Sequence, residues 1–365
     1  MGVVGVDGPT ASRAKVGLSK RQQRTVQMKL KRIAIDISKH AFTLHGVDDE
    51  ERPVLRRDLR RAEVETFFAK LDSTEVIMEA CGGAHHWGRV LARLGHKVRL
   101  IPAQYVRPFV RRAKNDRTDA EAINDAASRP GMPLVAVKTA QHQAELIILK
   151  HREMLVAQRT QAINALRGHA AEFGVVAAKG TAQVQPLLDK LASDPAIPAA
   201  ARAMFVRIGE HAAELGRQIA AVDADLSAQH KASSVSQMLA EVPGIGPVTA
   251  ITLAVGVDAA AFASGRHFAA WLGLTPKEHS TGGKQRLGRI SKAGNERLRS
   301  LLVVGAMAVI RHAKPGKPSV SPWLLALLAR KPRKLAAVAL ANKIARVVWA
   351  MMARGEVYRQ QPVAA

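Results

Sequence analysis

The pattern of apolar residues changes near residue 140, and this change limits the folds that the chain can adopt. Before it, short β-branched runs alternate with amphipathic stretches, whereas residues 140–230 are rich in Ala, Arg, Gln and Leu and hold few strand formers. Alternating strands and helices predict an α/β domain, and the later pattern predicts long helices. The expected fold class is therefore α/β followed by all-α.

The first expected strand carries a carboxylate among apolar residues. Ile33, Ile35 and Ile37 alternate with Ala34 and Asp36, which is the period-two pattern of a strand. A carboxylate in such a strand is costly to bury unless it is paired or bound to a cation. Further strands are expected at 40–47, 76–78 and 97–101, and helices at 62–71, 87–94 and 118–127.

Three more acids follow in this α/β region. Glu79 ends the strand at 76–78, and Asp116 and Asp119 are three residues apart, so on a helix they share one face. Converging carboxylates repel each other, and a divalent cation with hard oxygen ligands, Mg²⁺ or Mn²⁺, relieves that repulsion. Alternatively, Asp116 and Asp119 serve as helix N-cap and first-turn acid, and Glu79 caps the helix that follows. Asp36 is the hardest of the four to explain locally.

Residues 138–235 are expected to form a long antiparallel coiled-coil hairpin, which separates domains or dimerises. A heptad seam runs along its second half, at Phe205, Ile208, Ala212, Leu215, Ile219, Val222 and Leu226. A matching face runs along its first half, at Leu149, Val156, Ile163, Leu166, Ala170 and Phe173. Arg152 and Arg159 interrupt that face, and the breaker-rich segment 174–200 predicts an irregular tip.

A third, mostly helical unit is expected over 236–312, and a basic connector with a short helix and a terminal helix at 335–354 over 313–365. Pro243-Gly244-Ile245-Gly246 joins two helices and is typical of a helix-hairpin-helix turn. Backbone N–H groups at Gly244, Gly246 and the next helix start can hold a DNA phosphate without reading bases. An ordinary corner between two helices is the alternative.

A Gly-rich loop at 275–290 combines hydroxyls with cations. Ser280 and Thr281 stand before two glycines, which allow the backbone to approach a ligand. The cations that follow, which neutralise phosphate, are Lys284, Arg286, Arg289, Lys292, Arg297 and Arg299. A hydroxyl in this setting can attack phosphorus, or the loop can bind phosphate passively. A second basic stretch beside Asp116, expected to hold DNA or RNA, contains Arg107, Arg111, Arg112 and Lys114.

The overall charge points to a polyanionic partner. Lys and Arg number 55 against 30 Asp and Glu, a net charge of +25, which favours nucleic acid over a ribosome-like or membrane-surface role. The single cysteine, Cys81, excludes an internal disulfide and indicates a reducing compartment. Residues 1–27 are basic and lack an apolar signal core, so we expect a flexible arm or a misassigned start before Met28. No apolar run reaches the roughly 20 residues of a membrane span, so we expect a cytoplasmic protein with no membrane partner.

Five stretches, in this order, resemble the DEDD insertion-sequence transposases, which include Piv-like site-specific invertases and bridge-RNA-guided recombinases. The stretches are 33–40, 76–101, 114–123, 242–250 and 271–302. The resemblance implies a RuvC-like, ribonuclease-H-fold domain over 28–137 with Asp36, Glu79, Asp116 and Asp119 as its catalytic, metal-binding acids. It further implies that the coiled coil assembles a dimer or tetramer, that the C-terminal domain carries a serine nucleophile, and that a structured RNA guides the choice of DNA.

The chain departs from the family at the nucleophile. The family's serine directly precedes a glycine, whereas here Thr281 precedes Gly282 and Ser280 stands one residue earlier. Threonine is bulkier at Cβ, so Ser280 is the expected nucleophile and Thr281 the alternate. The expected function is a transposase or recombinase that cuts and rejoins DNA by Mg²⁺-assisted attack of this hydroxyl. The rival hypotheses are a metal-dependent junction nuclease in which water attacks, and a non-catalytic DNA-binding protein.

Overall fold

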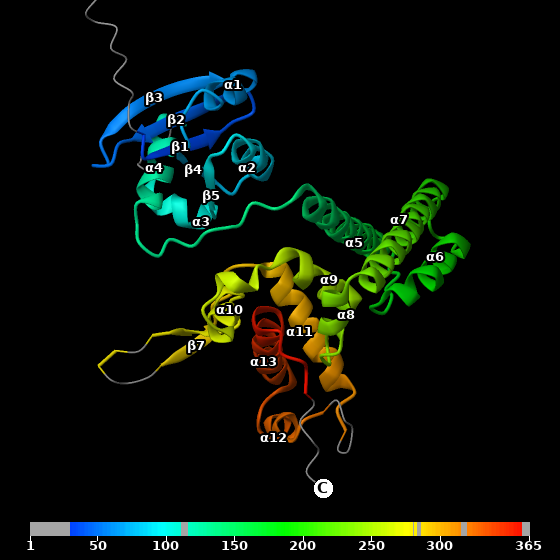
Figure 1. Ribbon diagram of the computed structural model, residues 1–365. Coiled ribbons are helices and arrows are strands. Elements are labelled where there is room, and N and C mark those ends of the chain that lie inside the picture. The colour runs from blue at the N-terminus through cyan, green and yellow to red at the C-terminus, as the bar shows by residue number, and fades with distance from the viewer. Residues whose placement is uncertain (1–29, 111–115, 280, 283–285, 315–319, 360–365) are drawn as a thin grey trace, which may run out of the picture. The chain divides into compact units, whose positions relative to one another are not determined.

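The computed structural model describes residues 30–110, 116–279, 281–282, 286–314 and 320–359 (Figure 1). The expected basic arm, residues 1–27, lies outside them. The chain consists of two compact units, residues 1–137 and 138–365.

A five-stranded mixed sheet forms the first unit. Its strands are β1 (Arg32–Ile37), β2 (Ala41–Val47), β3 (Pro53–Arg60), β4 (Glu75–Glu79) and β5 (Lys97–Ile101). The order across the sheet is β3-β2-β1-β4-β5, with β2 antiparallel to both β1 and β3, and β4 parallel to both β1 and β5. The α/β class expected for this part of the chain is therefore confirmed.

Helices cover both faces of this sheet. The helices of the first unit are η1 (Arg61–Glu63), α1 (Val64–Phe68), α2 (Ala84–Arg93), α3 (Ala103–Val106), η2 (Arg107–Phe109) and α4 (Asp116–Ala127). Because successive strand residues point to opposite faces, Ile33 and Ile35 join the core that contains α1 and α2, while Ala34 joins the core beneath α3 and α4. The face beneath α4 (the α4 face) therefore also receives Asp36, two residues beyond Ala34.

The edge strand β3 was not predicted. Its sequence, PVLRRDLR, is dominated by charged residues, and Arg56, Arg57 and Arg60 are all exposed. Charged side chains are common on edge strands, where they discourage pairing with another chain. A strand that buries so little apolar surface leaves only a weak hydrophobic pattern, which explains the omission.

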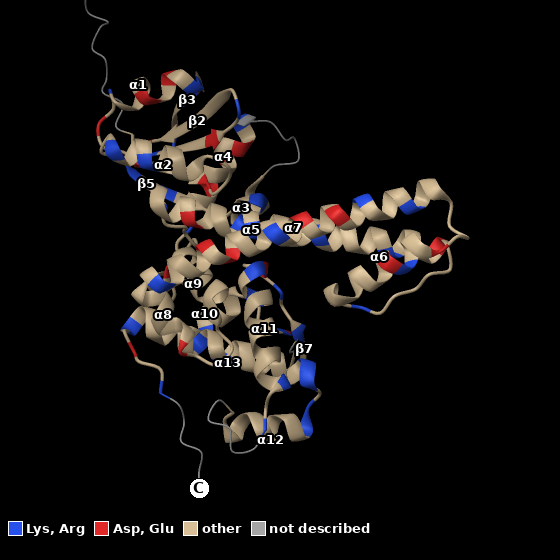
Figure 2. Ribbon diagram, turned by 90° about the vertical axis from the view of Figure 1, so that its right-hand side faces the viewer, with Lys and Arg blue, Asp and Glu red and all other residues tan. Residues whose placement is uncertain are grey.

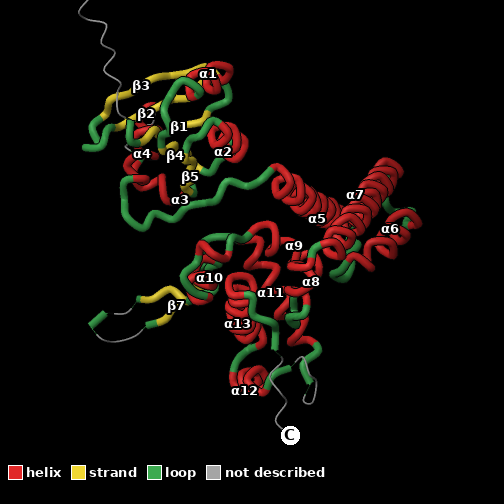
Figure 3. Tube along the Cα trace, viewed as in Figure 1, coloured by secondary structure: helices red, strands yellow, loops and turns green. Residues whose placement is uncertain are grey.

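Two long antiparallel helices, α5 (Ala140–Glu172) and α7 (Ala199–Ala232), open the second unit (Figure 3). Leu149, early in α5, packs with Leu226, late in α7. Arg152, which interrupts the apolar face, forms an ion pair with Asp223. The two helices and their antiparallel packing are as predicted, whereas coiled-coil supercoiling stays a prediction.

The expected irregular tip between these helices contains a regular element. After η3 (Thr181–Gln183), α6 (Val184–Ser193) buries Leu187 and Leu191 in a core shared with Phe205 of α7. The glycines and prolines around this segment led to the wrong prediction of irregular structure throughout. They fit a short helix because Pro186 stands in its first turn, where a backbone N–H has no partner within the helix.

The rest of the second unit is helical apart from one exposed ribbon. Its helices are α8 (Ser234–Ala240), α9 (Pro247–Gly256), η4 (Ala259–Ala261), α10 (Gly265–Trp271), α11 (Glu296–Arg311), α12 (Pro322–Arg330) and α13 (Arg333–Arg354). The ribbon pairs β6 (Pro276–Glu278) with β7 (Leu287–Ile290), where the sequence predicted only a loop.

Helix α13 is the apolar centre of this unit. It is the one helix among the described residues whose length and composition would allow it to cross a membrane. Of its most apolar 18-residue stretch, 44% is buried. It packs against α10 and α11 and contributes residues such as Ile344 and Val348 to the core. Core helices and membrane-spanning helices share this length and composition.

Candidate active site and nucleic-acid contacts

Asp36 and Glu79 lie at neighbouring positions on adjacent parallel strands. The register pairs Ala34 with Ile77 and Ile35 with Met78, so the next residues in step are Asp36 and Glu79. Ala34 and Ile77 both belong to the α4-face core, which places the two acids on that face. Both side chains are half-buried. The sheet therefore brings together two of the four predicted acids.

Asp119 approaches the same face from α4. Ala122 and Ile123, three and four residues later, are buried in the core that α4 forms with Ala34 and Ile77, so this side of the helix faces the sheet. The Oδ1 atom of Asp119 is buried and has no hydrogen-bond partner among the described residues. Asp116 begins α4, but its side chain lies outside the description. The predicted sharing of one helix face by these two acids therefore stays a prediction.

The charges of Asp36 and Glu79 also reach Cys81. The pKa of the Cys81 thiol is raised by burial and, further, by the negative charges of Glu79 and Asp36. One thiol thus responds to both carboxylates, in agreement with their adjacency in the sheet. Both carboxylates take part in interactions of their own, so neither is an isolated charge.

The donor chemistry at this place suits a hard divalent cation. Its oxygens come from carboxylates, and the buried oxygen of Asp119 lacks the partner that such an atom requires. Among the side chains that the structure describes, no three His, Cys, Asp or Glu residues gather closely enough to form a metal site by themselves. A complete ligand set would thus need Asp116, whose side chain is not among them, or movement of the other acids.

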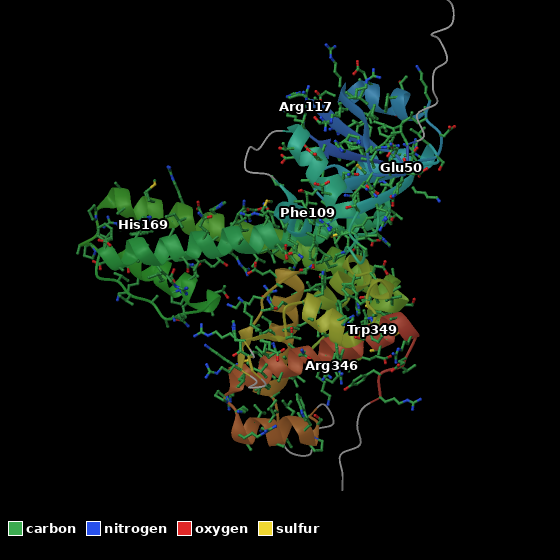
Figure 4. The ribbon with its side chains drawn as sticks, turned by 90° about the vertical axis from the view of Figure 1, so that its left-hand side faces the viewer. Glu50, Phe109, Arg117, His169, Arg346 and Trp349 are labelled. Atoms are coloured by element: carbon green, nitrogen blue, oxygen red, sulfur yellow. The ribbon has the colours of Figure 1, made fainter. Side chains whose placement is uncertain are left out.

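Two further residues on the α4 face were not anticipated. Thr43 on β2 is the register partner of Asp36, and Asp58 on β3 is the register partner of Thr43. The Thr43 hydroxyl donates to Oδ1 of Asp58 at 2.9 Å. Arg117, which Figure 4 shows at the start of α4, lies 3.7 Å from Oδ2 of Asp58. Asp58 could have been found from the sequence only if β3 had been recognised as a strand.

The two glycines of the predicted phosphate-binding turn differ in their surroundings. Gly244 has a φ of 94° and lies against the backbone of α11, where a Cβ on Gly305 would stand 1.9 Å from the Gly244 carbonyl oxygen. Gly246 precedes α9, and a Cβ added there would meet nothing within 4 Å. Gly244 therefore serves the packing of α8–α9 against α11, and the open backbone belongs to Gly246.

The predicted hydroxyl loop connects the strands of the exposed ribbon. Thr281 is exposed and is followed by Gly282, which has a φ of 57°. Ser280 and Lys284 lie outside the described residues. The backbone N–H of His279 donates to the Arg286 carbonyl oxygen at 2.9 Å, which continues the ribbon beyond β6 and β7. The described hydroxyl, Thr281, is therefore accessible on a projecting element.

The cations predicted around this loop fall into two groups. Arg297 forms an ion pair with Glu153 of α5, and Arg299 donates to the carbonyl oxygens of Leu272 and Ala293 at 3.0 and 2.8 Å. These two arginines support the fold of the second unit. The predicted cations that lie exposed on or beside the ribbon are Arg286, Arg289 and Lys292.

The predicted basic stretch beside Asp116 is described only in part. Arg107 is exposed in η2. Arg111, Arg112 and Lys114 lie outside the described residues. The structure therefore tests the position of Arg107 alone.

Comparisons with known proteins identify the chain's relatives. Residues 33–174 match a DEDD model of the IS110 group described as "Transposase", and residues 236–320 match the "Transposase IS116/IS110/IS902 family". A "Putative transposase y4pF/y4sB" of Sinorhizobium fredii is 50% identical over 331 residues, 90% of this chain and 86% of the relative. The chain belongs to the IS110 family of insertion-sequence transposases.

Two further relatives cover nearly the whole of both chains. A "Probable family 20 transposase" of Pseudomonas aeruginosa is 46% identical over 91% of this chain and 99% of its own length. The "Transposase for insertion sequence element IS1111A" of Coxiella burnetii is 37% identical over 97% and 98%. As a member of the IS110 family, the chain is a DNA transposase. The first family match spans all four predicted acids, and the second spans the glycine turn and the hydroxyl loop.

Proposed function

We propose that this IS110-family transposase cuts and rejoins DNA with two sets of groups. The carboxylates of Asp36, Glu79, Asp116 and Asp119 form the acidic set on a RuvC-like, ribonuclease-H-fold domain. A hydroxyl in the 275–290 loop, Ser280 with Thr281 as alternate, attacks the DNA. The observation that carries the proposal is that Asp36 and Glu79 are neighbours on the face of the sheet that α4 covers, and that α4 carries the buried, unpartnered Asp119 oxygen.

The four acids would hold Mg²⁺ or Mn²⁺. When bound, such an ion polarises a phosphoryl oxygen and stabilises the charge that develops in displacement at phosphorus. The chain's own contribution is positional. β1 and β4 fix two carboxylates side by side, and α4 brings Asp119 over the same face. β1, β4 and α4 are packed in the core of the first unit, so the acids that they carry have little freedom to move.

The hydroxyl step conserves the number of phosphodiester-type bonds. The Ser280 oxygen forms a new bond to phosphorus, the bond from phosphorus to the 3′ oxygen breaks, and the departing 3′ oxygen takes up a proton. The product is a DNA 5′-phosphate ester of serine, which a second 3′-hydroxyl can attack to rejoin the strand without hydrolysis. Arg286, Arg289 and Lys292 would hold the DNA backbone beside the loop, with Lys284, Arg297 and Arg299 nearby.

Further parts of the proposal concern partners and assembly. Arg107, Arg111, Arg112 and Lys114 would hold DNA or RNA, and a helix-hairpin-helix turn at Gly244 and Gly246 would hold a DNA phosphate. An element-encoded guide RNA would select the DNA. α5 and α7 would act as a coiled coil in a dimer or tetramer, and the protein would act in the cytoplasm without a membrane partner.

The mechanism is tested by trapping the covalent intermediate. Full-length protein is incubated with radiolabelled element-end DNA and Mg²⁺, and protein–DNA adducts are separated on a denaturing gel. We expect the adduct to be lost in Ser280→Ala and retained in Thr281→Ala, and the reverse pattern would make Thr281 the nucleophile. Undiminished cleavage in both variants would identify water as the nucleophile and support the nuclease hypothesis.

The guide RNA is tested separately. The protein is purified with its element's transcript under low salt, and the bound RNA is sequenced. A single element-encoded RNA is expected. A random collection of cellular RNA would reject guidance and leave the adduct experiment unaffected.

A further inference from the structure

The exposed edge strand β3 presents different chemistry on its two faces. Its register pairs Arg56 with His45, Asp58 with Thr43 and Arg60 with Ala41, which puts these three β3 residues on the α4 face. Arg57 and Leu59 alternate with them and point to the opposite face. There the Arg57 guanidinium lies over the Phe67 ring, and the Arg61 guanidinium lies over the rings of Phe42 and Trp87. Arg57 of β3 and Arg61, which begins η1 directly after the strand, therefore pack on aromatic rings, whereas Arg56 and Arg60 lie exposed on the α4 face.

The β3 arginines of the α4 face are close to the acids. Asp58 and Asp36 lie in one row across the sheet, separated by β2, which corresponds to about 10 Å between strands that are two apart. Arg56 and Arg60 are each two residues from Asp58, about 7 Å along the strand. α4 packs on β1, β2 and β4, while Arg56 and Arg60 are exposed. A cationic strip therefore adjoins the acidic row and is open to solvent.

Arg117 adds a third cation from a different element. It stands in the first turn of α4, between Asp116 and Asp119, and its guanidinium lies 3.7 Å from the Asp58 carboxylate (Figure 4). The Arg117 side chain is 79% exposed and that of Asp58 is 51% exposed. An exposed and loose ion pair of this kind contributes little free energy. Arg117 can therefore exchange Asp58 for a phosphate at small cost.

We propose that Arg56, Arg60 and Arg117, the β3 strip, bind the phosphate backbone of the DNA strand that enters the acidic site. The inference rests on the proposed function, because the acids need a phosphodiester beside them and carboxylates alone repel one. The strip has three cations, which outnumber the carboxylates of Asp58 and of Glu63, whose Oε2 accepts from the Arg60 backbone N–H, so it keeps the sign that DNA requires. The contacts are to backbone rather than bases, so they position the strand without selecting its sequence. Figure 2 shows the acidic residues of α4 that lie in the same unit.

The alternation of β3 supplies a matched control for the test. The double variant Arg56→Gln/Arg60→Gln changes the strip, and Arg57→Gln/Arg61→Gln removes the same charge from the neighbouring residues of β3 and η1, whose arginines lie on the opposite face. Binding of the full-length variants to a 30-base-pair DNA duplex is measured by fluorescence anisotropy over a range of salt concentrations. Thermal unfolding by circular dichroism shows whether each variant folds.

We expect Arg56→Gln/Arg60→Gln to reduce the slope of log affinity against log salt by about two, with roughly tenfold weaker binding at low salt. Arg57→Gln/Arg61→Gln leaves the slope unchanged. Arg117→Gln, on a separate element, reduces the slope by about one and keeps the inference testable if the strip double variant does not fold. Equal losses of affinity in the two double variants would overturn the inference and indicate that the overall positive charge attracts the DNA. No loss on the strip, or a loss seen only with an RNA duplex of the same length, would overturn it as well.

Failure of this inference is distinguishable from failure of the proposed function. Asp36→Asn/Glu79→Asn should abolish DNA cleavage and leave the salt slope as in the wild type or steeper. If that variant still cleaves, the proposed function is wrong whatever the arginine variants show. If it does not cleave and the strip variants bind normally, the function stands and the strip is wrong.

Discussion

The Nε atom of Arg32, the first residue of β1, donates to Oδ1 of Asn124 on α4 at 2.9 Å, and both side chains are buried. Glu51 pairs with the same guanidinium. The bond joins the strand that carries Asp36 to the helix that carries Asp119. It lies toward the start of β1, on the α4 face, and so fixes how α4 sits on the strand.

Loss of this bond should loosen α4 selectively. Arg32→Met leaves Oδ1 of Asn124 buried without its donor, and we expect the free energy of unfolding to fall by about 2 kcal/mol. Thermal unfolding gives the overall effect, and hydrogen exchange of the amides in 116–127 shows whether α4 is the element that opens. Arg52→Met is the matched control, since Arg52 is exposed and pairs with Asp48 and Glu50 of its own loop rather than with α4. Unchanged exchange in α4 would show that other contacts hold the helix.

The buried oxygen of Asp119 predicts a variant that loses activity without losing stability. Asp119→Asn removes a charge that has no hydrogen-bond partner at one oxygen, so the metal-free protein should unfold at the same or a higher temperature. The rise in unfolding temperature on adding Mg²⁺ should disappear, and DNA cleavage should fall by roughly 100-fold or more. Asp125→Asn, later on the same helix, is the control. Retained Mg²⁺ stabilisation in Asp119→Asn would exclude Asp119 as a ligand.

The sequence predicted that Asp36 lies on the first strand, and the alternation along that strand explains the face on which the structure places it. Ile33 and Ile35 are buried on one side of β1, so Asp36 must point to the other. Val76, Ile77 and Met78 are all buried, so the sequence predicted that this strand ends at Glu79 but not the face on which Glu79 lies. The register between β1 and β4 could not be predicted from either strand alone. It depends on the pairing of segments that are 43 residues apart, from Asp36 to Glu79, and only the structure shows it.

The missed elements share a physical cause. β3 and the β6–β7 ribbon are exposed, so neither has the apolar periodicity that reports burial. Arg56 and Asp58 were therefore not considered as site residues. The ion pair of Arg297 with Glu153 was missed for a different reason, since nothing near Arg297 in the sequence shows that its partner lies on a helix 144 residues away.

The close approach of Gly244 and Gly305 predicts a severe effect of a single methyl group. In Gly305→Ala the new Cβ would lie 1.9 Å from the Gly244 carbonyl oxygen, so α11 must move away from the turn. Overpacking of this kind costs about 1–3 kcal/mol or more, and thermal unfolding should show it. Gly168→Ala is the matched control, because Gly168 is also helical and a Cβ there meets nothing within 4 Å. That control should stabilise α5 by about 0.5–1 kcal/mol, and equal unfolding temperatures for the two variants would contradict the packing argument.

His45 predicts a pH dependence of the first unit. Burial lowers the pKa of His45 below its ordinary value of 6.5, and the positive charges of Arg56 and Arg32 act in the same direction, while Glu121 and Asp125 oppose them. The unfolded chain therefore binds the proton more readily than the folded one. The contribution of His45 to the free energy of unfolding is complete above pH 6.5, and it is lost as the pH falls from 6.5 towards the lower pKa of the folded state.

The unfolding temperature of the wild type should accordingly fall more between pH 7.5 and pH 5.5 than that of His45→Gln. Comparing the two proteins at each pH cancels the contributions of carboxylates that titrate lower, such as Glu51. His211→Gln is the control, since His211 is exposed on α7 and its variant should follow the wild type. A parallel pH profile for wild type and His45→Gln would mean that the pKa of His45 does not change on folding, because Glu121 and Asp125 offset burial and the two arginines.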